Sequence, residues 1–164
     1  MIKLLKFPIL FLISVVIQTT LISWIRVFDI GPDFILIFVV LVALRRGPIV
    51  GMLWGFFAGF SQDVYAPVEW LGAHTVALTV VGFIVGQFEE RFLSLNLVTK
   101  VGVLGLGFLI RDIIYFVVIG VKVDGEFASL LLMNTLPECI YTMLCGTLVF
   151  HFVFHRNGQR PHAR

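Results

Sequence analysis

Charged side chains are scarce in this sequence. They account for 13% of its 164 residues, and hydrophobic residues account for 59%, whereas a soluble domain carries about 25% charged residues. Apolar stretches recur along the whole chain, so no part of it is long and polar enough to form a separate soluble domain. We therefore predict one all-α integral membrane domain at residues 1–156, followed by a short basic cytoplasmic tail at 157–164.

Residue types that carry chemistry are also scarce. The two cysteines, Cys139 and Cys145, lie in one apolar segment, about 9 Å apart along a helix, which is too far for an unstrained disulfide. The sequence has no nucleotide-binding loop, no nucleophile motif and no cluster of metal ligands. We expect a protein that is not an enzyme, with no catalytic residue, no cofactor and no metal site, and with no nucleic-acid partner.

Six apolar segments remain when the chain is cut at its polar clusters, and each is predicted to be a transmembrane helix. The first has no small-x-small cleavage site after it, so we expect an uncleaved span. The six segments are about 6–25, 33–45, 48–64, 71–88, 98–121 and 128–153.

The second segment is the shortest. Asp33 to Arg45 covers about 18 Å at helical rise, against a hydrocarbon core of about 30 Å. A re-entrant hairpin is the alternative, but it would place Arg45 and Arg46 at the membrane centre, at about 2.5–3.5 kcal/mol each. We prefer a short span whose arginines reach the interface, followed by a tight turn at Gly47-Pro48 that starts the third span.

Lysine and arginine set the predicted orientation, because cytoplasmic loops carry an excess of both. An even number of spans puts both termini on one side of the membrane. With Arg111 left inside a span, only Arg26 and Lys122 fall on the opposite side. We therefore expect both termini in the cytoplasm. The nine basic residues on the side of the termini are Lys3, Lys6, Arg45, Arg46, Arg91, Lys100, Arg156, Arg160 and Arg164.

A line of glycines marks the third segment. Glycine recurs at every fourth position, and Asp63 takes the next place in the series. A step of four residues advances about 40° around a helix, so the line forms a slowly drifting ridge. Small residues let membrane helices approach closely, so the ridge is predicted to be a contact surface. Packing within the chain is the preferred reading, with a groove for another protein's helix or a small-molecule pocket as alternatives. The glycines are Gly47, Gly51, Gly55 and Gly59, with Gly82 and Gly86 repeating the spacing on the fourth span.

Arg111 lies near the middle of the fifth span and needs a partner, because a charge inside the membrane is expensive. Asp112 is adjacent but is expected to point about 100° away. Glu138 lies at a matching depth in the sixth span, about 15–16 Å from the same end. We predict that Arg111 and Glu138 pair across the hairpin of spans five and six, either to fix helix register or, as an alternative, to handle a proton or ligand.

Pro137 is predicted to kink the last span, because proline removes one helical hydrogen bond. Broken helices mark binding sites in some transporters, which leaves a functional role open.

Several features of the second and third spans occur in a fixed order. They are a Pro32-Asp33 entry, the basic pair Arg45-Arg46 before Gly-Pro, and a glycine-rich span that ends in Gly-x-x-x-Asp at Asp63. The stretch LGAHTVALTVVGFIVG and a last span interrupted by proline, LPECIYTMLCGTLVF, continue the pattern. In these features the chain resembles the rod shape-determining protein MreD family.

The resemblance implies a function that composition does not show. Members of this family are non-catalytic, multi-pass proteins of the bacterial cytoplasmic (inner) membrane that belong to the cell-elongation machinery. They bind MreC and help it regulate peptidoglycan synthesis by RodA and its penicillin-binding transpeptidase partner, with MreB in the same complex. Contacts with RodA, the transpeptidase and MreB would be direct or through MreC, and membrane lipids surround the bundle.

The resemblance also implies a fold similar to the S-components of energy-coupling-factor transporters. The alternative function is therefore that of a solute-binding S-component of a vitamin transporter. S-components typically carry an Ala-x-x-x-Ala motif on the first span, and here FPILFLISVVIQTTLISWI has none. The predicted outer loops also carry few polar side chains for a solute pocket, which favours the non-catalytic partner of MreC.

Overall fold

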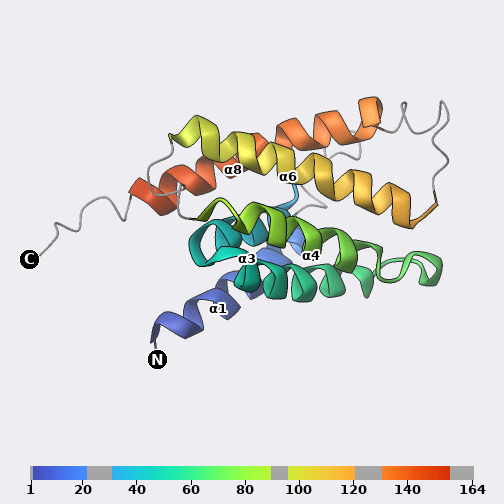
Figure 1. The fold of residues 1–164 in the computed structure, drawn as a ribbon, viewed down its shortest axis with the longest axis horizontal. Coiled ribbons are helices and arrows are strands. Elements are labelled where there is room, and N and C mark those ends of the chain that lie inside the picture. The colour runs from blue at the N-terminus through green and yellow to red at the C-terminus, as the bar shows by residue number, and fades with distance from the viewer. Residues whose placement is uncertain (1, 22–30, 90–95, 121–130, 156–164) are drawn as a thin grey trace, which may run out of the picture.

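The computed structural model describes residues 2–21, 31–89, 96–120 and 131–155, and every regular element within them is helical. The predicted tail, residues 22–25 of the first predicted span, and Arg26, Arg91 and Lys122 lie outside the described residues. The helices lie side by side along the long axis of the molecule (Figure 1). In chain order the elements are α1 (Ile2–Val16), the π-helical turn η1 (Ile17–Leu21), α3 (Phe34–Asp63), the 3-10 turn η2 (Val68–Trp70), α4 (Ala73–Gly86), α6 (Leu97–Val118), the π-helical turn η3 (Leu131–Thr135) and α8 (Leu136–His155).

α3 is a helical hairpin whose two arms, residues 34–46 and 48–63, are joined at Gly47. Gly47 has φ 84° and ψ −178°, a backbone region that is essentially restricted to glycine. The rings of Phe38 and Trp54 lie 5.4 Å apart, whereas a straight helix would separate these residues by about 24 Å. The chain therefore reverses at Gly47-Pro48, with proline at the first position of the second arm, where its missing N–H costs nothing.

The first arm of α3 is the centre of the protein. Its residues from Ile35 to Leu44 are all buried, as expected for a helix that is hydrophobic all round. The ring of Phe11 in α1 lies 5.6 Å from that of Phe38, tilted by 43°, and Phe108 of α6 and Phe150 of α8 belong to the same apolar cluster. The remaining helices thus surround this arm.

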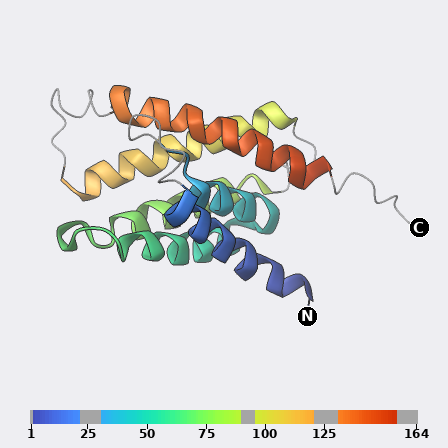
Figure 2. The same ribbon diagram turned by 180° about the vertical axis from the view of Figure 1, so that it is seen from behind.

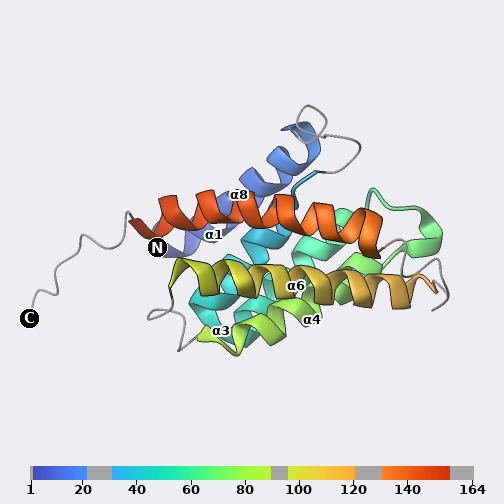
Figure 3. The ribbon, with the colours of Figure 1, turned by 90° about the horizontal axis from the view of Figure 1, so that it is seen from above.

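Two pairs of helices pack as antiparallel neighbours. The second arm of α3 lies beside α4, and α8 lies alongside α6 (Figure 3), while α1 crosses α3 on the face seen in Figure 2. The first turn of α1 and the last turn of α8 lie at the same end as the Gly47 reversal (Figure 1). Arg46 supports this placement, since its guanidinium lies 4.9 Å from the ring centre of Phe7 in α1.

Three helical stretches in the described residues are long and apolar enough to cross a membrane, namely Phe34–Asp63, Val68–Gly86 and Leu97–Val118. Helix is present within each of the six predicted apolar segments. The arms of α3 would cover only about 20 Å and 24 Å of a bilayer. Six crossings and cytoplasmic termini stay predictions.

Candidate functional site

The glycine line of α3 lies against α4 of the same chain. A Cβ placed on Gly55 would be 2.8 Å from the carbonyl carbon of Leu78, and one on Gly59 would be 2.6 Å from the amide nitrogen of Thr75. Nonbonded carbon atoms prefer about 3.5–4.0 Å, so neither position has room for a side chain. The second arm of α3 and α4 are therefore in backbone contact.

The contact is reciprocal along its length. A Cβ on Gly82 would lie 2.6 Å from the carbonyl carbon of Gly51, and one on Gly86 would meet Pro48. Each step of four residues along α3 thus matches a step of four back along α4. At the reversal, a Cβ on Gly47 would meet the carboxylate of Glu89. Of the three readings of the ridge, the geometry is that of packing within the chain.

Asp63 ends the glycine line by capping α4. Its Oδ1 accepts the N–H of His74 at 3.0 Å, and its Oδ2 accepts the N–H of Thr75 at 2.9 Å and the hydroxyl of Thr75. These amides belong to the first turn of α4. The N–H groups in the first turn of a helix have no partner within that helix, and they attract negative charge. Asp63 therefore ties the end of one glycine-packed helix to the start of the other.

Asp33 joins three helices at the start of α3. Its Oδ1 accepts the N–H of Leu36 at 2.8 Å, which makes it the N-cap of α3. The N–H of Asp33 donates to the hydroxyl of Thr142 in α8 at 3.0 Å, and the N–H of Phe34 donates to Gln18 Oε1 at 2.9 Å. Pro32 precedes this cap and is buried, so the Pro-Asp entry lies inside the bundle.

Arg111 lies among three carboxylates. Its Nη1 is 3.3 Å from Asp33 Oδ2, its Nε is 3.0 Å from Asp112 Oδ1, and its Nη2 is 3.9 Å from Glu138 Oε1. Arg111, Asp33 and Asp112 are all buried. The cluster links the entry of α3 to α6 and α8.

The expectation that Asp112 points away from Arg111 is wrong. Adjacent Cβ atoms on a helix do diverge by about 100°, but Nε is carried on a flexible stem that bends toward its neighbour. The partner predicted from depth, Glu138, has the longest of the three distances. The helix changes from π to α geometry at Leu136, directly before Pro137. The irregularity in this helix therefore lies next to Pro137, where a kink was predicted, and next to Glu138.

A cavity of about 310 Å³ opens beside this cluster. This polar cavity was not predicted from the sequence. Only the outer loops were considered as a source of polar lining residues, whereas several of the polar lining residues lie inside the predicted spans. His74 lines the cavity and stacks on Tyr115 at 4.4 Å between ring centres. Six elements and the short segments that flank them contribute to the lining, which consists of Val15, Gln18, Thr19, Asp33, Ile35, Ser61, Gln62, Tyr65, His74, Arg111 and Glu138.

Gln18, Gln62 and Thr142 are the site residues that sequence reasoning missed. Each is a polar side chain inside an apolar segment, and that exception was the available signal. Thr142 also follows Glu138 by four residues, so both lie on one face of α8. Arg45 and Arg46 lie at the other end of the first arm of α3, beside the Gly47 reversal.

A family model described as rod shape-determining protein MreD matches residues 1–156. The chain belongs to the MreD family. No curated protein and no solved structure matches it.

Membership makes the chain a rod shape-determining membrane protein. The MreD family is defined by cell shape, not by a catalysed reaction. Among the described residues no group of three His, Cys, Asp or Glu side chains is placed to hold a metal ion.

Proposed function

We propose that this MreD-family protein is a non-catalytic, multi-pass component of the bacterial cytoplasmic membrane that binds MreC. Through MreC it would help regulate peptidoglycan synthesis by RodA and its transpeptidase partner, in the complex that contains MreB. The family match over residues 1–156 is the observation that carries the proposal. The helices that are long and apolar enough to cross a membrane support it.

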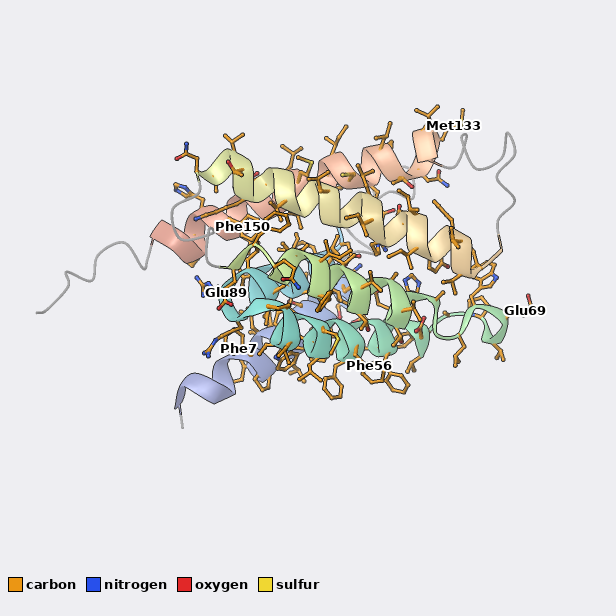
Figure 4. All side chains as sticks on the ribbon, viewed as in Figure 1. Phe7, Phe56, Glu69, Glu89, Met133 and Phe150 are labelled. Carbon is orange, nitrogen blue, oxygen red and sulfur yellow. The ribbon has the colours of Figure 1, made fainter. Side chains whose placement is uncertain are left out.

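The internal packing suggests how binding would work. Gly51, Gly55 and Gly59 are covered by α4, so a partner helix would meet the outward faces of the bundle instead. Phe56 of the second arm points away from the bundle (Figure 4) and is 47% exposed. In this proposal the glycines and the Arg111 cluster hold a rigid body, and that body presents its outer surface to MreC and to lipid.

Site-specific photo-crosslinking in cells tests the proposal. The crosslinker would be placed at one outward residue on each of four helices, with buried Leu78 as the control position. We expect MreC to be captured from one or two adjacent faces and not from Leu78. Absence of an MreC adduct from every outward face, in cells whose shape the variants support, would overturn the proposal. The outward positions are Leu12, Phe57, Leu106 and Leu144.

A second function, that of a solute-binding S-component of a vitamin transporter, is favoured by one observation. The cavity of about 310 Å³ is lined by charged and polar side chains and lies within the size range of small-molecule pockets. Mass spectrometry of the protein released intact from mild detergent separates the two functions. A stoichiometric bound vitamin supports the second function, whereas retention of MreC without a vitamin supports the first.

A further inference from the structure

The charge cluster around Arg111, beside the cavity, has an excess of negative charge, and Asp33, Arg111 and Glu138 of this cluster line the cavity. One guanidinium is surrounded by the carboxylates of Asp33, Asp112 and Glu138, all within 4 Å of its nitrogens. The formal charges of these four side chains sum to an excess of two negative charges. Charges removed from water need compensation, and Arg111 brings one positive charge to the three carboxylates.

The carboxylates differ in how far their side chains are exposed. Asp33 uses one oxygen to cap α3 and the other to meet Arg111, and Asp112 is buried against the Arg111 Nε. The Glu138 side chain is 35% exposed and lines the cavity. Glu138 is therefore the carboxylate best placed to meet a ligand.

The walls also carry hydrogen-bonding atoms that the described residues do not satisfy. Gln62 Oε1 and His74 Nδ1 are buried atoms without a hydrogen-bond partner there, and both residues line the cavity. A buried acceptor that is left unpaired is costly, because it has lost its hydrogen bonds to water. A ligand that brings N–H donors would satisfy such atoms, whereas another carboxylate would not.

Apolar groups complete the lining. Val15 and Ile35 lie in the same cavity as the charged residues, and they suit methylene groups. A volume of about 310 Å³ is at the lower end of the range for small-molecule pockets. The cavity thus combines negative charge, hydrogen-bond acceptors and a small apolar surface.

We propose that this cavity binds a small aliphatic diamine in its diammonium form. One ammonium group lies beside Glu138 and Asp33 and donates toward Gln62, and the methylene chain lies against Val15 and Ile35. Its two positive charges match the two excess negative charges of the whole Arg111 cluster, Asp112 included. This inference holds whether the protein acts through MreC or as a solute-binding component, because it concerns only the cavity.

Binding to the full chain in phosphatidylcholine nanodiscs tests the proposal, since this zwitterionic lipid gives a dication no anionic surface. The probe is 1,4-diaminobutane, and 1,4-butanediol is the uncharged control of the same length. We expect the diamine to bind and to raise the thermal midpoint, and the diol to do neither. Equal binding of the two compounds, or no binding of the diamine, would overturn the proposal.

Two substitutions locate the binding. Glu138→Gln should weaken diamine binding about tenfold or more, because charge-assisted hydrogen bonds are the strong ones. Glu69→Gln, at an exposed acid of η2, is the matched control and should bind as the unaltered chain does. Gln62→Met should also weaken binding while it keeps side-chain length, and midpoints without ligand show whether each variant is folded. Unaltered affinity in folded Glu138→Gln protein would contradict the assignment.

Discussion

Replacing Gly55 by alanine should break the α3–α4 contact at its middle. The added methyl group would lie 2.8 Å from the carbonyl carbon of Leu78 and 3.1 Å from the Cα of Thr79. Because ordinary carbon contacts are about 3.5–4.0 Å, the two backbones would have to separate by roughly 0.7 Å or more. Overpacking of this kind costs about 1–3 kcal/mol, and here backbone, not a flexible side chain, must move.

Gly102 provides the matched control. It lies inside α6, where an added Cβ meets nothing within 4 Å, so Gly102→Ala brings the helix propensity of alanine without a clash. In an ordinary helix that exchange is stabilising by about 0.5–1 kcal/mol. The two variants thus differ in the neighbour that the methyl group meets.

Unfolding of the purified protein by denaturant in detergent micelles measures both effects. We expect Gly55→Ala to lose about 1–3 kcal/mol and Gly102→Ala to be unchanged or more stable. The pair Gly51→Ala and Gly82→Ala should be non-additive, because these residues face each other across the contact. Full stability of Gly55→Ala would refute the view that this ridge is filled by α4.

Three other substitutions probe the remaining contacts. Asp63→Ala should lose about 0.5–2 kcal/mol of unfolding free energy, because it removes the capping bonds to α4, and it should impair cell shape. Glu69→Ala should change the unfolding free energy by no more than about 0.5 kcal/mol. Equal complementation of a shape defect by both variants would contradict this ranking. Arg111→Leu should cost about 3–5 kcal/mol, because it leaves three carboxylates together without their cation, and wild-type stability in the same denaturant assay would show that the cluster is not the tie described. Gly47→Ala should cost about 1–3 kcal/mol, since its φ of 84° with ψ of −178° suits glycine alone, and a neutral result would argue against the sharp reversal of α3.

Features that depend on the geometry of a single helix or turn could be predicted from the sequence. Gly47-Pro48 combines the residue that permits a reversal with the one that starts a helix, and α3 reverses there. Helical rise placed Arg111 and Glu138 at matching depths, and their side chains lie 3.9 Å apart. These inferences depend on one helix at a time, where rise and rotation are fixed.

Most contacts between helices could not be predicted from the sequence. The first arm of α3 is apolar on every side, but in a membrane protein lipid-facing and buried helices look alike, so its central position could not be read from hydropathy. The bond from the N–H of Asp33 to Thr142 joins residues 109 positions apart. The Asp112 contact depends on the bending of a long side chain, and the cavity depends on how six elements meet, which no periodicity encodes.

Measuring the association of the two proteins is the most direct test of the proposal that this chain binds MreC in the membrane. Full-length MreC and the full chain, each carrying one fluorophore, would be reconstituted together in nanodiscs and their energy transfer measured against an unrelated single-span protein. We expect specific energy transfer that unlabelled MreC competes away and that Gly102→Ala leaves unchanged. Transfer no greater than that of the unrelated span, with a folded chain, would contradict it.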